Sequence, residues 1–514
     1  MRVTGNWAAL IRRSFKRTRT SAEYAGGCNP SFSSWGAALW IILAVSAIRL
    51  LAGARYPLTP DESYYWVWSR HLAYGYTDHP PMVAWLIALT SVLGKSPLAV
   101  RLPFIVCEAI AAFAAGRAAI VLSSDDHAGA AAALAVLLIP QGRLAVGEAL
   151  PDGPYLAAWA LALWSSAQLS KRPSLAVAVA LGLALGGTLL SRFFGWALVC
   201  GLILYALAPQ RRALWRQGLW LSLLIALALY APFLVWNAHH GWSNFAFTFA
   251  ARQPVHGFSA QRLQVITSLR LVLFAALFWV VAYFTILRPR FALLGWTALL
   301  FPTAIAALSF FQTTESYYIL GPLISLCVAI GIAYARQSIA WRRILLILAL
   351  IPATYTMIAA VFVGLPEAAQ ATALRASGGA LKGPFFSQAF AFTPLAQSVQ
   401  RLSNGEPVFT DRLEIAAQLT YQGVPSSIVG GAPQVAQWTW WYGDRIPERV
   451  LLVTFDPIAK ESDFGRRIIA SFASVSTGPT LQFRFAGTDM VPFYSTWCQH
   501  PSASARTLLF GSAL

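Results

Sequence analysis

The sequence predicts a mainly α-helical, polytopic membrane protein with a small α/β domain at its C-terminal end. Hydrophobic residues make up 57% of the 514 residues, and the mean hydropathy is +0.58. Soluble domains are about 45–50% apolar. Apolar runs recur between residues 36 and 365, and after residue 365 shorter stretches with strand character replace them. These observations predict a membrane helical bundle followed by a separate domain.

The chain begins with a basic segment and a first spanning helix. Residues 1–35 carry six arginines and lysines against the single acid Glu23, and residues 36–53 contain only one charge, Arg49. We expect a cytoplasmic tail followed by a membrane helix. We expect no signal-peptidase cleavage at residues 52–54, because the apolar core is longer than that of a typical leader.

The remaining apolar runs suggest about eleven spanning helices in total. Residues 82–94 form a run of only 13 residues, about 20 Å as a helix, whereas the hydrocarbon core is about 30 Å thick. This run predicts an interfacial or re-entrant helix. The spanning runs after the first are centred near residues 111, 135, 162, 182, 200, 227, 277, 301, 327 and 353. The runs near 182 and 200 are short and could form one broken pair.

The basic residues predict the orientation. Arginines and lysines fall in alternate loops, with examples at Lys171-Arg172, Arg211-Arg212 and Arg342-Arg343. Basic loops lie on the cytoplasmic side of membrane proteins. The loops on the other side, including residues 58–81, are therefore expected outside, in the periplasm of a Gram-negative host. This placement also explains the net charge of +18 without a nucleic-acid partner.

The C-terminal part reads as alternating strands and helices. Residues 406–414 and 450–456 read as short buried strands, and a helical stretch covers residues 415–421. We therefore divide the chain into a cytoplasmic tail (1–35), a transmembrane domain (36–365) and an extracytoplasmic α/β domain (366–514). The five cysteines form no paired motif, so we infer neither a disulfide framework nor a metal cluster.

Residues 58–81 concentrate charge in a protein that is only 11% charged. They hold Asp61, Glu62, Arg70, Asp78 and His79 directly after the first membrane helix. Charged side chains at a membrane surface are costly and normally serve a function. An ordinary helix start, with acids favoured by the helix dipole and aromatic residues at the lipid interface, is the structural alternative. That alternative leaves the Asp78-His79-Pro80-Pro81 motif unexplained.

The two motifs together resemble a known family. An Asp61-Glu62 pair after the first helix, followed sixteen residues later by Asp78-His79-Pro80-Pro81, resembles the dolichyl-phosphate-mannose protein mannosyltransferases and their bacterial relatives, including the transferases that place aminoarabinose on lipid A. The resemblance implies a glycosyltransferase C fold and a lipid-phosphate-linked sugar donor. It also implies that Asp61 is catalytic. A general base of this kind contributes about 10²- to 10⁴-fold in rate.

The resemblance extends to residues in later external loops. Asp152 matches the family's second acid and is our second catalytic candidate, although a plain Pro-Asp-Gly turn fits the same residues. Arg192 stands where the lipid A transferases have a lysine, so we expect it to bind phosphate. Snorkelling towards lipid headgroups is the alternative for this arginine. Arg252, at the end of the next external segment, is a second phosphate candidate.

Two further segments complete the candidate site. His239-His240 resembles the family's external segment, but two adjacent histidines without a spaced carboxylate are a weak metal motif. No cofactor is therefore required, and a divalent metal is possible. Glu315 and Tyr318 resemble the late motif that faces the lipid-linked sugar, with an interfacial aromatic belt as the alternative. The expected substrate-binding residues are Glu62, Arg70, Asp78, His79, Arg192, His239, Arg252, Glu315 and Tyr318.

The predicted function is transfer of a hexose or pentose from a polyprenyl-phosphate donor to an extracytoplasmic acceptor, which could be lipid A, a glycan or a protein. The enzyme would sit among membrane lipids in the bacterial inner membrane, with its active site facing the periplasm. An oligosaccharyltransferase or ligase with a diphosphate-linked donor is one alternative. A lipid or sugar transporter is another, but its acids would lie near the bilayer midplane.

Overall fold

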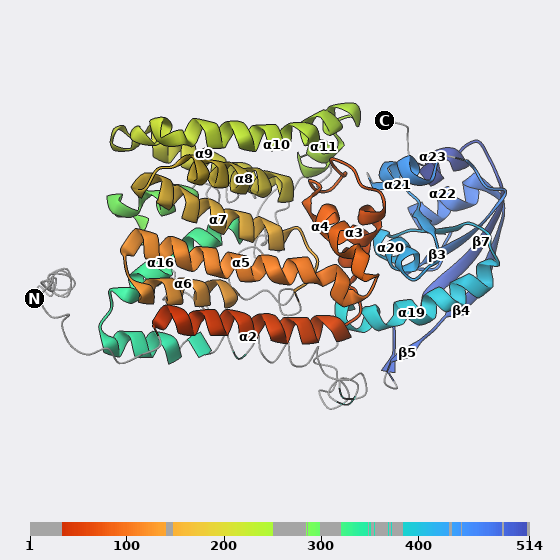
Figure 1. The fold of residues 1–514 in the computed structure, drawn as a ribbon. Coiled ribbons are helices and arrows are strands. Elements are labelled where there is room, and N and C mark those ends of the chain that lie inside the picture. Colours follow the sequence, from red (N-terminus) through yellow and green to blue (C-terminus); the bar gives the residue numbers. More distant parts are fainter. Residues whose placement is uncertain are drawn as a thin grey trace, which may run out of the picture.

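A computed structural model describes the chain as a helical bundle with an α/β unit at one end (Figure 1). The described residues are 33–139, 147–249, 284, 286–298, 320–347, 349–350, 354, 369, 372, 384–430, 434–443, 445–485 and 488–510.

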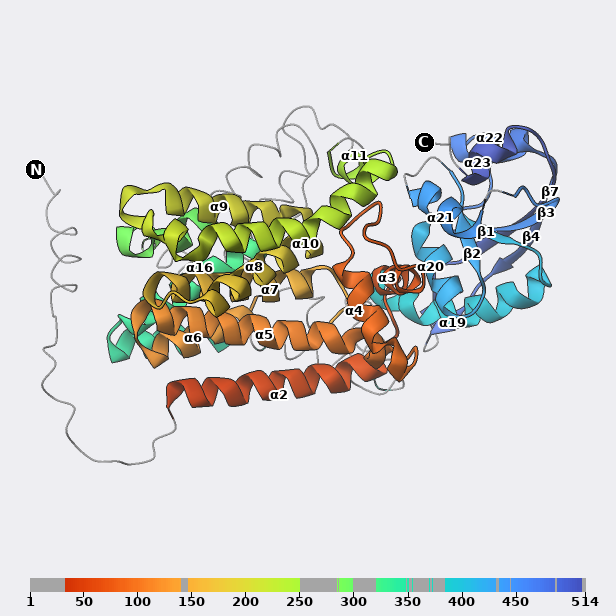
Figure 2. The ribbon, with the colours of Figure 1, turned by 45° about the horizontal axis from the view of Figure 1, so that its top comes forward.

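The helices of the bundle lie side by side (Figures 1 and 2). The bundle contains α2 (Ser34–Arg55), α5 (Pro97–Ser123), α6 (Asp126–Leu137), α7 (Asp152–Lys171), α8 (Leu175–Ser191), α9 (Trp196–Leu207), α10 (Trp220–His239) and α16 (Leu320–Ala335). Helix α5 packs against α2, α6, α7 and α16. Its buried face is rich in alanine, including Ala111, Ala115 and Ala118. Small side chains let helix backbones approach closely, as in other membrane bundles.

Three of the described helices are long and apolar enough to cross a membrane: Ser34–Arg55, Pro97–Ser123 and Trp215–His239. The last of these joins α10 to a preceding π-helical turn, Trp215–Leu219. Shorter apolar helices cover Met82–Leu93, Asp126–Leu137, Leu175–Ser191, Phe193–Leu207 and Leu320–Ala335. The predicted total of about eleven spans stays a prediction, since the runs centred near 277, 301 and 353 lie outside the described residues, as does most of the basic tail.

The structure gives exact boundaries to the short helices that the sequence suggested. The run after residue 82 forms the short helix α4 (Met82–Thr90), followed by a 3₁₀ turn at Ser91–Leu93. The runs near 182 and 200 are two helices, α8 and α9, separated by a break at Arg192 and a 3₁₀ turn at Phe193–Gly195. Helix α10 continues through residues 236–239, so the external segment that we expect there begins as a helix. Further short helices are Pro209–Arg211, α11 (Ser243–Phe249) and Pro289–Phe291.

The C-terminal region forms the expected α/β unit around a five-stranded sheet. Its strands, in the order β2-β1-β3-β7-β4, are β1 (Val408–Thr410), β2 (Ser426–Ile428), β3 (Arg449–Thr454), β4 (Phe472–Leu481) and β7 (Phe493–Pro501). Strand β1 runs parallel to β2 and β3, whereas β7 is antiparallel to β3 and β4. A separate pair joins β5 (Arg484–Phe485) and β6 (Thr488–Asp489). The helices are α19 (Pro384–Ser403), α20 (Leu413–Tyr421), α21 (Gln434–Tyr442), α22 (Asp463–Ser471) and α23 (Ala505–Phe510).

The α/β unit docks on the bundle through helix α3 (Pro60–Arg70) and the loop that follows it. Helix α20 packs against α3, and the Gln418 side chain donates a 2.7 Å hydrogen bond to the carbonyl of Leu58. From α21, the buried Trp438 ring stacks on Tyr64 at 5.5 Å. One aromatic core therefore spans both parts of the chain and fixes the motif of residues 58–81 at their junction.

Candidate active site

Helix α3 begins with a cap that separates the roles of its two acids. Thr59 and Glu62 form a capping box, in which the Thr59 N–H donates to Glu62 Oε2 at 2.9 Å and the Glu62 N–H donates to Thr59 Oγ1 at 3.4 Å. Glu62 is fully buried, whereas Asp61 is only half-buried. Successive helix positions differ by about 100°. Asp61 therefore points in a different direction from Glu62.

Glu62 is held by Arg101 of helix α5. The Arg101 guanidinium donates from Nε to Glu62 Oε1 at 2.7 Å and from Nη2 to Oε2 at 2.5 Å. It also donates to the carbonyls of Gly53, Tyr56 and Pro57 at 2.7–2.8 Å. Both side chains of the ion pair are completely buried. The Arg101 guanidinium thus joins the end of α2, the start of α3 and the start of α5.

Glu62 also joins α3 to the segment that leads into α7. The Ala149 N–H donates to Glu62 Oε1 at 3.0 Å, three residues before Asp152. The carboxylate thus accepts from Thr59, Arg101 and Ala149. We therefore revise our expectation that Glu62 contacts a substrate: its contacts position Asp61 and the Asp152 segment at the same end of the bundle.

Asp152 and Arg192, which the sequence suggested separately, meet in the structure. Asp152 is the first residue of α7, and Arg192 directly follows α8 in an extended conformation. Nη2 of Arg192 donates to Asp152 Oδ2 at 2.8 Å, and Nε lies 2.8 Å from Oδ1 with poorer alignment. Both side chains are about 95% buried. Asp152 thus holds Arg192 in place, and this pairing replaces the picture of two independent groups.

A third buried ion pair was not predicted. Arg49 of α2 lies 2.8 Å from Glu108 of α5, and both side chains are only 5% exposed. Glu108 is close enough to Asp152 for their charges to interact. The signal for Arg49, Arg101 and Glu108 was a charge inside or beside an apolar run, which marks a functional or paired residue in membrane proteins.

An apolar groove of about 610 Å³ runs along helices α7 and α8. Helix α7 lines it with residues at helical spacing, from Pro154 through Leu161 to Gln168, and α8 does the same from Ser191 to Ala176. Both stripes extend about 14 residues, or roughly 20 Å at 1.5 Å per residue. Pro154 lies two residues after Asp152, and Ser191 directly precedes Arg192. One end of the groove therefore lies beside a buried, charged pair.

The second half of the opening motif lies at the junction with the α/β unit. Asp78 Oδ2 accepts a 3.3 Å hydrogen bond from Gln434 Nε2, and the His79 ring lies 6.0 Å from the ring of Tyr65. Burial, together with the charge of Asp78, raises the pKa of Tyr64 well above its ordinary value. The Tyr64 phenol is therefore neutral at physiological pH.

The other predicted residues divide into three groups. Arg70 is exposed and lies over the Trp66 ring, 5.3 Å from its centroid. His239 is exposed, and the next residue, His240, lines a cavity in its place. Arg252, Glu315 and Tyr318 lie outside the described residues. Within the part of the chain that the structure describes, no three His, Cys, Asp or Glu side chains gather as metal ligands would.

Comparison with known proteins confirms the resemblance. The sequence model of the dolichyl-phosphate-mannose-protein mannosyltransferase family matches residues 78–236. A lipid A galacturonosyltransferase, RgtD of Rhizobium johnstonii, is 30% identical over 183 residues. That match covers 35% of this chain and 38% of RgtD, so the chain spans little more than a third of the relative's length.

Solved structures confirm the fold. The apo structure of ArnT from Cupriavidus metallidurans matches with a TM-score of 0.62 and 16% identity, over 89% of this chain and 97% of ArnT. The structure of ArnT bound to undecaprenyl phosphate matches equally well. An apo oligosaccharyltransferase from Archaeoglobus fulgidus matches with a TM-score of 0.51 and 11% identity, over 93% of this chain and 78% of its own. The helical bundle with a C-terminal sheet therefore shares the fold of ArnT.

Proposed function

We propose that this chain is an integral-membrane glycosyltransferase. Residues 78–236 match the mannosyltransferase family model, and the chain shares the ArnT fold. It moves a sugar from a polyprenyl-phosphate donor to an extracytoplasmic acceptor. The basic loops support an inner-membrane location with the site facing the periplasm. The division into residues 1–35, 36–365 and 366–514 is part of the same proposal.

The observation that carries the proposal is the apolar groove that ends beside Asp152 and Arg192. A polyprenyl phosphate has a long apolar chain and an anionic head. The groove offers an apolar lining for the chain, and the buried Arg192 guanidinium near its end suits the phosphate. Arginine grips phosphate oxygens through a planar set of donors. ArnT, which shares the fold, was solved with undecaprenyl phosphate, and this supports the assignment. We retain Arg252 as a second phosphate ligand.

The reaction needs a group that accepts a proton. The acceptor hydroxyl oxygen attacks the anomeric carbon, the bond from that carbon to the phosphate oxygen breaks, and polyprenyl phosphate leaves with the bond's electrons. Asp61 receives the hydroxyl proton, because it stands in the first turn of α3 and is not buried like Glu62. If the acceptor is itself a phosphate, Asp61 orients it instead. The buried ion pairs that join the helices around this step are Arg49–Glu108, Arg101–Glu62 and Arg192–Asp152.

Lipid A is the acceptor that the relatives favour. RgtD is named a lipid A galacturonosyltransferase, and the motif resembles transferases that modify lipid A. A glycan or a protein is the alternative acceptor. Whether a hexose or a pentose is transferred follows from the donor that the enzyme accepts.

Two other functions have an observation in their favour. The fold similarity to an oligosaccharyltransferase is consistent with a diphosphate-linked donor. The buried pair Arg49–Glu108 is the kind of intramembrane charge that transporters also use.

The deciding experiment uses purified protein in liposomes. Radiolabelled polyprenyl-phosphate hexoses and pentoses are each offered with lipid A, a glycan and a protein acceptor. We expect label to move from one monophosphate donor to lipid A. Transfer only from a diphosphate donor would establish the ligase alternative. Movement of intact lipid across the bilayer without any sugar transfer would establish the transporter.

A further inference from the structure

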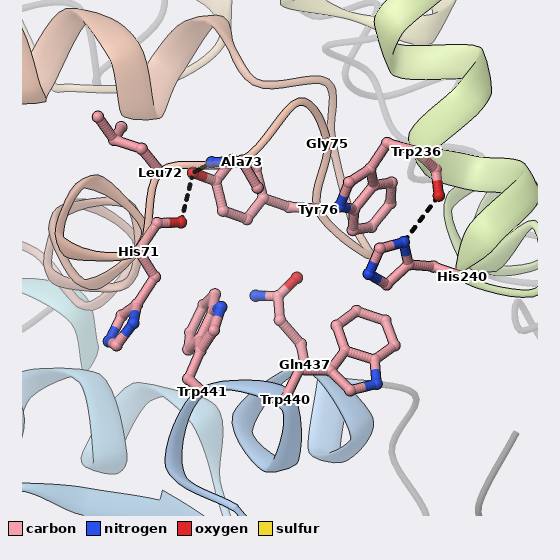
Figure 3. A pocket seen from close by; sticks show the side chains of 10 residues that line it. All are labelled: His71, Leu72, Ala73, Gly75, Tyr76, Trp236, His240, Gln437, Trp440 and Trp441. Atoms are coloured by element: carbon pink, nitrogen blue, oxygen red, sulfur yellow. Dashed lines mark hydrogen bonds between the residues drawn. The ribbon is translucent and has the colours of Figure 1, made fainter.

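A second cavity, of about 340 Å³, lies between the bundle and the α/β unit (Figure 3). Three segments line it: the loop after α3, the end of α10, and helix α21. The lining residues are His71, Leu72, Ala73, Gly75, Tyr76, Trp236, His240, Gln437, Trp440 and Trp441. Its volume is within the range of about 300–1,000 Å³ that is usual for small-molecule sites.

Stacked pairs of aromatic rings wall the cavity. His71 stacks on Trp441 with centroids 4.6 Å apart and planes 8° apart, and His240 stacks on Trp236 at 4.2 Å and 15°. Trp440 meets His240 edge-on at 4.7 Å. Each stack fixes the orientation of a histidine without covering it with a charged group.

Gln437 brings an unpartnered donor to the cavity. It is 1% exposed, and its Oε1 accepts a 2.8 Å hydrogen bond from the Thr77 N–H, which fixes the orientation of the amide. Among the described residues its Nε2 has no hydrogen-bond partner. A buried donor without a hydrogen bond destabilises the folded state, so a ligand that accepts from it is favoured. Figure 3 shows the Gln437 amide in the middle of the cavity, between the aromatic walls.

His240 offers a complementary acceptor. Its Nδ1 lies 2.7 Å from the carbonyl oxygen of Trp236, so in the neutral ring Nδ1 carries the proton and Nε2 accepts. Figure 3 shows this second nitrogen on the cavity side of the ring. Across the cavity, burial and the charge of Arg70 lower the pKa of His71. No carboxylate stands among the ten described lining residues. These groups favour an uncharged ligand.

We propose that this cavity binds a neutral pyranose residue of the acceptor glycan. A pyranose has an apolar face of C–H groups that packs on aromatic rings, and hydroxyls that both donate and accept. The Gln437 amide donates to one hydroxyl, and His240 accepts from another. The assignment to the acceptor rests on the proposed glycosyltransferase function. The saccharide site itself stands on the cavity alone.

The test measures binding of methyl hexopyranosides to the full-length protein in nanodiscs by saturation-transfer NMR. Gln437→Glu keeps the acceptor for Thr77 and removes the donor. Trp440→Ala removes a ring that is 40% exposed, so the fold is expected to tolerate it, and Trp440→Phe restores a ring. Gln422→Glu adds the same charge outside the cavity and serves as the control. We expect roughly tenfold weaker binding for Gln437→Glu and for Trp440→Ala, with Trp440→Phe and Gln422→Glu close to wild type.

Acceptor kinetics connect the cavity to the reaction. In the two weakened variants the KM for a glycan-bearing acceptor should rise about as much as saccharide binding falls, with kcat little changed. Equal saccharide binding by the wild type and all four variants overturns the saccharide site. Binding of the cation tetramethylammonium in place of sugars overturns it too, because the cavity would then be a cation site. Lost saccharide binding with an unchanged acceptor KM overturns its assignment to the acceptor. A further outcome is a wild type that transfers no sugar and still binds the saccharide, with weaker binding in Gln437→Glu and Trp440→Ala. That result would overturn the proposed function and leave the saccharide site in place.

Discussion

Arg101 and Glu62 form an ion pair that is completely buried, with Nη2 2.5 Å from Oε2. The guanidinium also holds three backbone carbonyls, and the carboxylate holds the N–H of Ala149. Removal of one partner of a buried pair costs about 3–5 kcal/mol, because the other charge stays buried and unpaired. The end of the bundle at which we propose the reaction therefore depends on this one buried pair.

The first prediction concerns this pair. Arg101→Ala and Glu62→Gln should both lower the thermal unfolding midpoint in detergent. The loss of unfolding free energy should be several kcal/mol for Arg101→Ala. Arg117→Ala, on the same helix and only partly buried, is the control and should cost less than about 1 kcal/mol. Glu62→Gln that folds should keep most of its turnover per folded molecule. Wild-type stability of Arg101→Ala would contradict the structural role.

The second prediction concerns Arg192 as a phosphate ligand. Arg192→Ala should weaken binding of polyprenyl phosphate roughly ten- to a hundredfold, since a charge-assisted contact contributes about 1.5–3 kcal/mol. Arg192→Lys should recover only part of this, because lysine keeps the charge and loses the planar donors. Dissociation constants from scintillation proximity binding provide the measurement. A lysine variant that binds as well as the wild type would indicate a snorkelling arginine instead.

The third prediction concerns the groove. Ala180→Phe places a ring in the groove wall on α8, where the alanine is exposed and lines the space. The KM for a donor with a long polyprenyl chain should rise about tenfold, a loss equivalent to a few buried methylenes. A donor with only two isoprene units should be affected much less. Leu175→Phe, on the same helix but outside the groove, is the control. Equal effects on long and short donors would mean that the chain lies elsewhere.

The fourth prediction concerns pH and the α/β unit. Burial raises the pKa of Asp411, just after β1, to about 6. An unfolded aspartate ionises near pH 3.9, so between about pH 4 and 6 the folded state binds more protons than the unfolded state. The contribution of Asp411 to stability therefore falls as pH rises through this window. The unfolding midpoint of Asp411→Asn, relative to wild type, should rise from pH 4 to 7 and then level off. A difference in unfolding midpoint that stays constant with pH would show that Asp411 does not change the stability in this window.

The sequence predicted the parts of the site that lie in one motif and missed those that depend on pairing. The position of Asp61 at the start of a helix, directly after the first membrane helix, followed from order along the chain. Asp152 and Arg192 were each recognised, but their contact joins residues 40 positions apart and no local pattern records it. Arg101 escaped notice because a charge at the start of an apolar run looks like an ordinary loop residue.

The fold was predictable to a similar extent. Apolar runs located most of the described helices, and the strands β1 and β3 followed from their short apolar stretches. Helix α10 extends through residues 236–239, because polar residues at a membrane surface continue a helix as readily as they form a loop. The signal for the aromatic cavity was the cluster of tryptophans around Trp440, but its partners at Tyr76 and Trp236 come together only through docking of α21 on the bundle.

The most direct test of the proposed mechanism is the rate of sugar transfer by Asp61→Asn. The variant should transfer labelled sugar from the preferred polyprenyl-phosphate donor at least about 10²-fold more slowly, with donor affinity and unfolding midpoint close to wild type. Asp126→Asn, an exposed acid at the start of α6, provides the matched control and should retain full activity. Wild-type turnover by Asp61→Asn, or an equal loss in folded, donor-binding Glu62→Gln, would contradict the assignment of Asp61 as the catalytic base.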